Sequence, residues 1–375
     1  MKELIRFELG KLLHRPLAFA SLAGLAIYTA YMLCLWVIPI NTIVREDIDG
    51  EMKTYKGMAA VRRNQEIISL YEGPFTTDKI QSIIENYSFS AAAMEKNNMN
   101  PDTQIRYPHN YLYDLIKGFF LNPDGTYTDE TVENVYGELA PGLILGYSEG
   151  WSCMLATLPD VFPVWACVLA VILSPVFSEE YSRHTDALVL TGSQGRTKCP
   201  TAKITAAYII SLGGSLVILT IFLLCLFFCY GFTGLDSSIQ LSKFMSLQYY
   251  TLYLGQAFAL VLLLLFSGII VYTALILLIS ALSRNSYASM IISATVLLAP
   301  LSIPMDSSIN KLLYIVCALL PIHQLKIINL FYLPHPLPIA LSDVQIMLLS
   351  LPVTLAAILI GIPCAKRTFS RHQVR

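Results

Sequence analysis

Charged side chains are scarce in this sequence: Asp, Glu, Lys and Arg together make up only 14% of its 375 residues. The mean hydropathy is correspondingly high, at +0.58. Length and composition narrow the class of a protein before any motif is considered. This composition excludes a soluble enzyme that merely has a large apolar core, and it indicates an integral membrane protein.

Motifs for nucleotide and metal chemistry are also missing from the sequence. A phosphate-binding loop needs the pattern G-x-x-x-x-G-K-[ST], so that backbone amides and a lysine surround the phosphates. The stretch 192–198, GSQGRTK, has a similar composition but the wrong spacing. There is no H-E-x-x-H motif, and the six histidines are scattered along the chain. We therefore expect no bound metal or cofactor, and any ATP that is used must be bound by another chain.

The eight cysteines do not form a disulfide framework. Only Cys153 lies clearly in the polar part of the chain, and Cys225 and Cys229 are one helical turn apart within an apolar run. No other pair has the spacing of metal ligands or of a stapled loop. The N-terminal apolar run is longer than that of a secretory signal, and no small-x-small cleavage site follows it. We expect this run to remain as a membrane span.

Long uncharged runs are the dominant positive feature of the sequence. A helix rises about 1.5 Å per residue and must cross about 30 Å of hydrocarbon, so that about 18 to 25 apolar residues suffice for one crossing. Six runs meet this length criterion, and the spans are expected within 16–39, 160–179, 203–236, 255–282, 284–306 and 343–366. A seventh run, of 14 residues between Lys311 and Lys326, is too short for a crossing and is bracketed by prolines. It predicts a short helix at the outer surface over 309–326.

The distribution of basic residues predicts the orientation of these spans. With six spans both termini share one side, which carries 13 basic and five acidic residues in its short segments. The opposite side carries 12 basic and 21 acidic residues, mostly within the long segment 40–157. Short loops rich in Lys and Arg face the cytoplasm. Both termini are therefore expected in the cytoplasm.

Two segments outside the spans have helical patterns. Residues 1–15 predict an amphipathic helix at the membrane interface, with Leu4, Ile5, Leu9, Leu12 and Leu13 on its apolar side. The segment 40–157 predicts a mainly helical extracellular insertion that is long enough for a small domain, with nine basic and 17 acidic residues. Its helices are expected over 47–71, 77–98, 107–121 and 129–139, with Thr77 and Thr128 as N-caps.

The linker 177–203 is the one sizeable charged segment apart from 40–157. Its sequence Glu179-Glu180-Tyr181-Ser182-Arg183 is similar to the paired glutamates and arginine of the intramembrane proteases that process CAAX proteins and bacteriocins. Residues 331–335, FYLPH, also resemble the F-x-x-x-H motif of that family. The arginine comes one residue early, however, and the predicted topology places His335 across the bilayer from the glutamates.

The linker more closely resembles the membrane subunits of type-2 ABC transporters, the ABC-2 permeases. That family has the pattern F-x-x-E-x-x-x-G-T after span two, followed by leucines, P-x-x-R and a lysine that opens span three. His184 and Ser193 depart from it, since glycine and proline are usual at these two positions. The positions that match are Phe177, Glu180, Thr185, Leu188, Leu190, Arg196 and Lys203.

The resemblance implies an all-α integral membrane protein with six transmembrane helices, an amphipathic N-terminal helix and an insertion between spans one and two. The expected parts are 1–39, the insertion 40–157, spans two to six over 158–365 with a coupling segment at 178–203, and a basic cytoplasmic tail at 366–375. A coupling segment docks on an ATPase subunit and transmits its movement to the spans. The residues implied in this coupling are Glu179, Glu180, Arg183, Thr185, Leu188, Arg196 and Lys203.

The resemblance also implies a function and partners. The chain would be a permease subunit without enzymatic activity of its own, pairing with two ABC ATPase subunits and a second permease, identical or related, in a bacterial plasma membrane. Export of a peptide, lipid or other amphiphile is expected, with membrane lipid as surroundings and no nucleic acid as partner. The spans have essentially no acidic residues, which disfavours a proton-coupled carrier. The protease and a non-transporting membrane sensor remain as alternatives.

Overall fold

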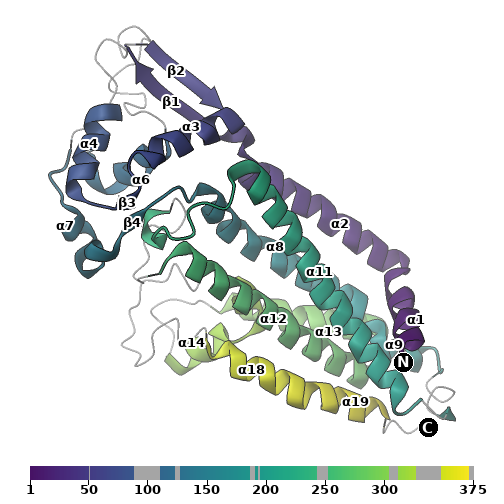
Figure 1. Cartoon of the computed structure of the whole chain (residues 1–375). Helices are drawn as coiled ribbons and strands as arrows, with labels where there is room; N and C mark the ends of the chain where they lie inside the picture. The colour runs from purple at the N-terminus through teal and green to yellow at the C-terminus, as the bar shows by residue number, and fades with distance from the viewer. Residues whose placement is uncertain are drawn as a thin grey trace. The chain divides into compact units, whose positions relative to one another are not determined.

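The computed structural model is mostly helical and divides into two compact units (Figure 1). Unit 1 contains Met1–Tyr31, Leu158–Ile221 and Leu260–Arg375, and unit 2 contains Met32–Thr157 and Phe222–Ala259. The structure describes residues 1–49, 51–87, 110–122, 127–185, 191–192, 195–242, 252–303, 311–326 and 348–370.

Among the described residues, five helical segments are long and apolar enough to cross a membrane. The expected span over 284–306 corresponds to the shorter apolar segment Ser286–Ser302, in which α13 (Ser286–Leu298) is followed by a single 3-10 turn. The sequence expectation of several membrane-length apolar helices is therefore confirmed, with five that meet the length criterion. The five segments are Pro16–Asn41, Glu149–Ser182, Lys198–Tyr230, Leu254–Leu282 and Ser350–Ser370.

These segments are built from individual helices whose breaks follow the sequence. Pro175 begins a new helix directly after Ser174, because proline is well tolerated at the first helical position. The helices are α2 (Pro16–Met32), α8 (Glu149–Leu173), α9 (Pro175–Ser182), α11 (Lys198–Tyr230), α12 (Leu254–Leu282), α18 (Ser350–Ala356) and α19 (Ile362–Ser370).

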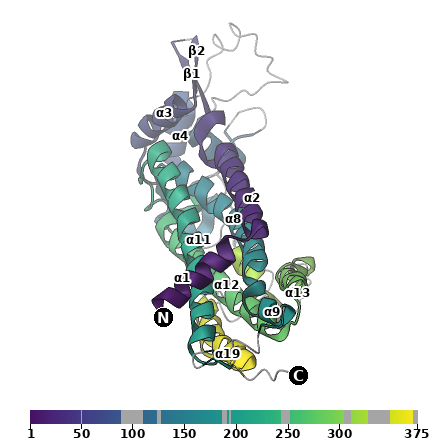
Figure 2. The same ribbon diagram turned by 90° about the vertical axis from the view of Figure 1, so that its right-hand side faces the viewer.

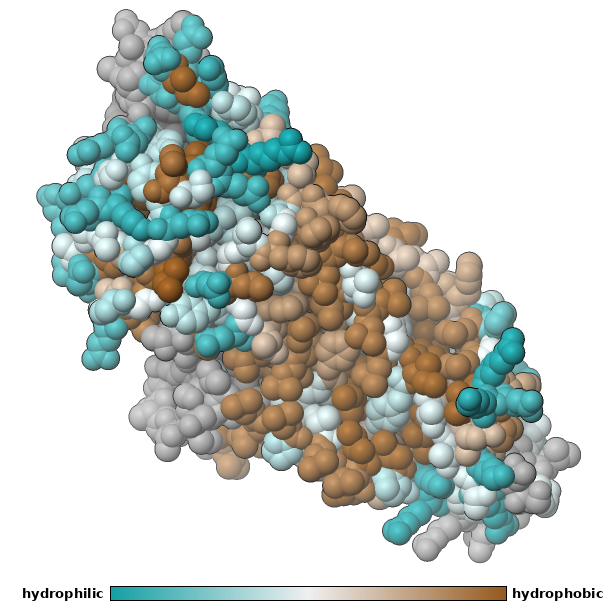
Figure 3. Space-filling model, viewed as in Figure 1, coloured by the Kyte–Doolittle hydropathy of each residue, from teal (hydrophilic) through white to brown (hydrophobic). Residues whose placement is uncertain are grey.

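The long helices have apolar side chains on their exposed faces as well as on the faces that pack against other helices. In α11 the side chains of Ile209, Leu216, Val217 and Phe228 are all exposed. Figure 3 shows hydrophobic side chains covering α2, α11 and α12, whereas hydrophilic side chains gather over β1 (Ile43–Ile48), β2 (Glu51–Lys56) and α3 (Met58–Ser69). Large contiguous exposed apolar surfaces mark membrane or protein contacts. Lipid contact explains these surfaces, since the helices have membrane length.

Small and hydroxyl-bearing residues allow α8 and α11 to approach each other closely. The indole of Trp165 is buried and donates a hydrogen bond to Ser215 Oγ (3.0 Å). A Cβ atom placed on Gly214 would lie 2.2 Å from this indole, so that only glycine fits there. Thr273 on α12 donates to Ser211 Oγ (2.8 Å). Such small and polar contacts are typical of helix packing within membranes.

Unit 2 contains a β-hairpin where the sequence predicted the start of a helix. Strands β1 (Ile43–Ile48) and β2 (Glu51–Lys56) pair in antiparallel fashion, and Ile48 pairs with Glu51 across a two-residue turn. Asp49 has a φ of 56°, and Asp-Gly is a strong signal for this kind of turn. The predicted helix over 47–71 was therefore wrong up to Lys56 and right for α3 (Met58–Ser69), because an Asp-Gly sequence favours a hairpin turn over a continuous helix.

The remaining elements of unit 2 are short helices around an aromatic core. Asn110 and Thr131 cap α6 and α7 by accepting hydrogen bonds from Tyr113 N (2.8 Å) and Asn134 N (3.2 Å). The sequence predicted Thr128 as the N-cap of this helix, whereas the N-cap of α7 is Thr131. Strand β3 (Gly73–Pro74) pairs with β4 (Ile144–Leu145), and the helices are α3 (Met58–Ser69), α4 (Thr77–Tyr87), α6 (Tyr111–Phe120) and α7 (Val132–Tyr136).

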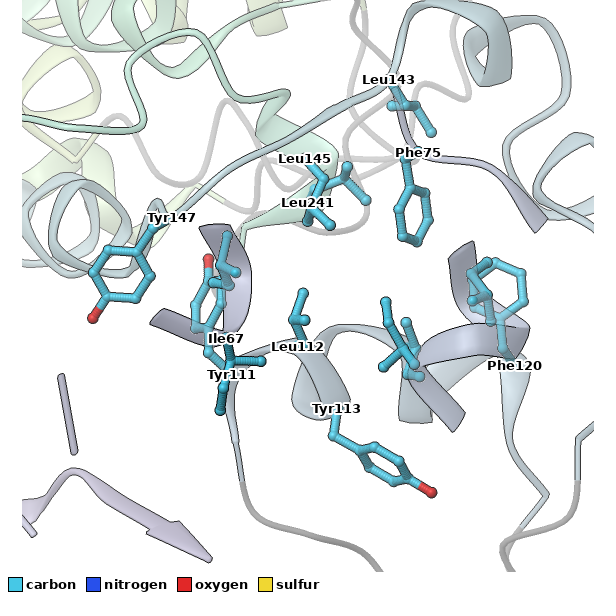
Figure 4. Packing of buried hydrophobic residues seen from close by; sticks show 14 of the residues in the cluster. Ile67, Phe75, Tyr111, Leu112, Tyr113, Phe120, Leu143, Leu145, Tyr147 and Leu241 are labelled. Carbon is cyan, nitrogen blue, oxygen red and sulfur yellow. The ribbon is translucent and has the colours of Figure 1, made fainter. Parts of the chain in front are cut away.

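The core of unit 2 draws on segments that are far apart in sequence (Figure 4). Phe75 and Phe120 contact each other edge to face, with ring centroids 6.3 Å apart. Tyr147 lies beside Tyr111, and Leu241 joins the same cluster from beyond the end of α11. The insertion and its neighbours therefore have a hydrophobic core of their own, so that unit 2 has the contacts of a folded domain.

Residues 311–326 form two helices where one was expected. The first is α14 (Lys311–Ala318) and the second is α15 (Pro321–Leu325), which begins at a proline. Proline cannot continue the preceding helix without losing a backbone hydrogen bond. In α15 the side chains of His323 and Gln324 are almost fully buried.

Candidate functional site

Two consecutive glutamates in the last turn of α9 form the centre of the candidate site. Glu179 and Glu180 are 8% and 5% exposed, so that both carboxylates are nearly shielded from solvent. Neighbouring residues on a helix point about 100° apart. The two side chains therefore face different partners, and each has its own group of ionic contacts.

Glu179 is surrounded by three cationic side chains. Lys11 Nζ lies 3.1 Å from its Oε2, and Arg183 Nη2 lies 2.9 Å from its Oε1. Arg15, the residue directly before α2, also donates to Oε2. We call these four residues the Glu179 cluster. It connects the end of α9 to the N-terminal helix α1 (Lys2–Leu13) and to the start of the first span.

Glu180 belongs to a buried ion triad with Lys203 and Glu8. Lys203 Nζ lies 2.7 Å from Glu180 Oε1 and 3.0 Å from Glu8 Oε1, and the lysine side chain is 0% exposed. A buried charge is tolerated only when it is paired with good geometry. Figure 2 shows α1 crossing α11 at this end of unit 1. The triad thus ties α1, α9 and α11 together.

The N-terminal helix contacts the rest of unit 1 through a face that combines a leucine with charged side chains. Glu8 and Leu12 are buried, whereas Phe7 is 67% exposed and Leu13 is 37% exposed. The helix expected over 1–15 is therefore present as α1, and ionic contacts as well as Leu12 hold it against the protein; its place at the membrane interface stays a prediction. Glu8, Lys11 and Arg15 follow one another at spacings of three and four residues, which is the signal that could have identified this face.

The structure brings together most of the residues implied in coupling. Glu180 pairs with Lys203. Arg183 pairs with Glu179, since an i,i+4 spacing places it on the same helix face. Thr185 is exposed and its N–H donates to Glu180 O (2.9 Å).

The C-terminal end of the linker 177–203 is among the described residues from residue 195 onward. Arg196 is exposed, and its carbonyl accepts a hydrogen bond from Ser370 Oγ (3.0 Å) at the end of α19. This contact places the end of α19 beside the start of α11, at the same end of unit 1 as α1. Leu188 lies outside the described residues.

The C-terminus of α9 places position 184 in a left-handed backbone conformation. His184 has a φ of 57°, in the left-handed region, and its N–H donates to Tyr181 O (3.2 Å). Together with the hydrogen bond from Thr185 N to Glu180 O, this is a Schellman motif, in which glycine is usual at the left-handed position. The histidine is accommodated here in a conformation that glycine adopts without steric cost.

Replacing His184 with glycine is expected to stabilise the protein by about 1 kcal/mol, because a left-handed residue with a Cβ atom costs about 1 to 2 kcal/mol. Thermal unfolding of the purified protein in detergent measures this effect. His184→Ala is the matched control, since it removes the imidazole but keeps the Cβ atom. Equal stability of the two variants would show that backbone strain at this position is unimportant.

A metal ion is not the best explanation for the acidic groups of the triad. Ligand atoms of Glu8, Glu180 and Cys199 lie within 4.8 Å of one another. The ammonium group of Lys203, however, contacts both carboxylates directly. A divalent cation at this point would have to displace that buried charge or lie next to it. The lysine therefore already supplies the counter-charge that these carboxylates need.

The paired glutamates are not arranged as the base of a protease either. A general base must be able to accept a proton from water. Glu179 is engaged by three cations, and Glu180 is paired with Lys203 in a buried site. His335, the second residue of the protease interpretation, lies outside the described residues.

The sequence matches no protein-family model, and comparison with curated proteins and with solved structures gave no match. The functional interpretation therefore depends on the residues and geometry described above.

Proposed function

We propose that this chain is the membrane-spanning permease subunit of a type-2 ABC transporter, driven by ATPase subunits on separate chains. The buried triad of Glu8, Glu180 and Lys203 is the observation that carries the proposal. Glu180 and Lys203 are matching positions at the two ends of the linker that resembles a coupling segment. Their ion pair joins the two ends of this linker directly.

This geometry suits the transmission of movement from an ATPase to the spans. A packed and paired junction moves as a unit, since its close contacts are not continuously deformable. A displacement of the linker would therefore shift α9, α11 and α1 together. In this proposal Glu180 and Lys203 are positioning residues, because their side chains are too buried to contact a partner. The ATPase would contact the exposed residues Arg183, Thr185 and Arg196.

The wider assignment follows from the same proposal. The ends that carry α1, the linker and α19 would face the cytoplasm of a bacterial cell, in agreement with the excess of basic residues in these segments. A second permease subunit, identical or related, would complete the substrate pathway. The substrate class proposed is a peptide, lipid or other amphiphile that is exported from the cell or extracted from its membrane. The outer insertion would then face the extracellular side.

Capture of an ABC ATPase tests this proposal. When the chain is co-expressed with ABC ATPases of its own organism, we expect one of them to co-purify with it. Arg183→Glu combined with Arg196→Glu should weaken this capture by about 30-fold or more, because reversing an interfacial charge costs about 2 to 5 kcal/mol. Both side chains are exposed, and Glu179 would keep its contacts with Lys11 and Arg15, so that the variant should remain inserted and folded.

Arg62→Glu is the control for the charge change. Arg62 is an exposed arginine on α3 in unit 2, and its reversal should leave the capture unchanged. Wild-type capture in the Arg183→Glu/Arg196→Glu variant would place the coupling surface elsewhere.

The protease alternative has a test of its own. Peptide cleavage by the purified chain that is lost in the Glu179→Gln variant would support this alternative.

A further inference from the structure

A cavity of about 450 Å³ lies beside the Glu179 cluster, between the start of α2, the end of α9 and the start of α13. Its polar lining includes Arg15, Glu179 and Arg183, and its apolar lining includes Leu17, Val171 and Met290. All of these residues belong to unit 1. Neither the proposed coupling of an ATPase nor the packing of the spans requires a cavity at this position.

The charges around this cavity are unbalanced. Glu179 supplies one negative charge, whereas Lys11, Arg15 and Arg183 each supply one positive charge and all three contact it. The Glu179 cluster therefore has a net charge of +2. Arg183 keeps 72% of its side chain exposed and Arg15 keeps 21%, so that both guanidinium groups can still reach a ligand. Guanidinium groups bind phosphate through paired hydrogen bonds.

The N-terminus of α13 also contributes to the lining of the cavity. Asn285 caps α13 by accepting a hydrogen bond from Tyr287 N (2.8 Å), and Asn285, Ser286 and Tyr287 all line the cavity. The first turn of a helix carries a partial positive charge from its backbone N–H groups. This charge adds to that of Arg15 and Arg183 and has the same sign.

The opposite wall of the cavity is apolar and continues onto the surface of the helices. Leu17, at the start of α2, is 53% exposed, and Met290 is half-buried in α13. Tyr287, which is 70% exposed, is also part of the lining. Tyrosine is enriched at the headgroup level of membranes. A lining that combines two arginines with apolar side chains matches a phosphate group with an acyl chain attached.

We infer that this cavity binds an anionic phospholipid from the leaflet at this end of the spans. Its phosphate lies between Arg15 and Arg183, and its acyl chain covers Leu17 and Met290. The bound lipid would balance the excess charge of the Glu179 cluster and hold α1 at the membrane surface. This inference does not depend on the proposed transport function.

Native mass spectrometry of the full-length protein in detergent tests the site, with phosphatidylglycerol and phosphatidylcholine as the probes. The wild-type protein should retain phosphatidylglycerol and should bind phosphatidylcholine at least about 10-fold more weakly, because only the former is anionic. Arg183→Gln should weaken phosphatidylglycerol binding by about 10-fold, the usual effect of losing one charge-assisted contact. Arg6→Gln is the matched control, since Arg6 is exposed on α1 and does not line the cavity.

Met290→Trp distinguishes a cavity from general electrostatic attraction. This change fills the apolar part of the cavity without altering any charge, and it should reduce phosphatidylglycerol binding to a similar extent. The inference is overturned if Arg6→Gln and Arg183→Gln lose binding equally, or if Met290→Trp binds as the wild type does. Displacement of the lipid by millimolar inorganic phosphate would show that the site takes a soluble anion and not a phospholipid.

Discussion

Replacing Lys203 with methionine is expected to destabilise the protein by about 3 to 5 kcal/mol. The change would leave Glu8 and Glu180 facing each other in a buried site without the ammonium that now lies 3.0 and 2.7 Å from their oxygens. Removing one partner of a buried ion pair is costly because the remaining charge is uncompensated. The midpoint of thermal unfolding, measured on the purified protein in detergent, should fall clearly below that of the wild type.

The whole triad can be neutralised as a control for this effect. A triple variant, with Glu8→Gln, Glu180→Gln and Lys203→Met, contains no buried charge at this position. Replacing all members of a buried ionic group is often close to neutral for stability. The triple variant should therefore recover most of the stability that Lys203→Met loses. If the Lys203→Met variant unfolds at the wild-type temperature, the ion pairs of the triad do not stabilise the fold.

Replacing Gly214 with alanine is expected to separate α8 from α11 locally. The added Cβ atom would lie 2.2 Å from the indole of Trp165, which is fully enclosed and hydrogen-bonded to Ser215. Overpacking of this kind typically costs about 1 to 3 kcal/mol, because side chains are forced from their preferred rotamers. We expect a lower unfolding temperature and a change in tryptophan fluorescence, since the indole must move.

Gly213 provides a matched control for this substitution. It is the preceding residue of the same helix, and a Cβ atom added there would meet no atom within 4 Å. Gly213→Ala should be neutral or stabilising by up to about 1 kcal/mol, since alanine favours the helix more than glycine does. Equal unfolding temperatures for Gly213→Ala and Gly214→Ala would show that Trp165 is free to move away.

The candidate site could be located from the sequence only in part. Glu180, Arg196 and Lys203 were identified because they fall at fixed distances within one continuous segment. Glu8 was missed as a partner, since 195 residues separate it from Lys203. Its spacing from Lys11 and Arg15 shows which residues share a helix face, but not which distant helix that face contacts.

The sequence by itself determined that this protein has several apolar helices of membrane length. The length of an uncharged run can be counted directly in the sequence, and the thickness of the bilayer sets how many apolar residues a crossing helix needs. The tertiary structure alone decided that Glu179 and Glu180 belong to two different ionic groups. Burial and pairing of charges depend on which helices pack together, and that packing is set by side-chain shape at contacts such as Gly214 with Trp165.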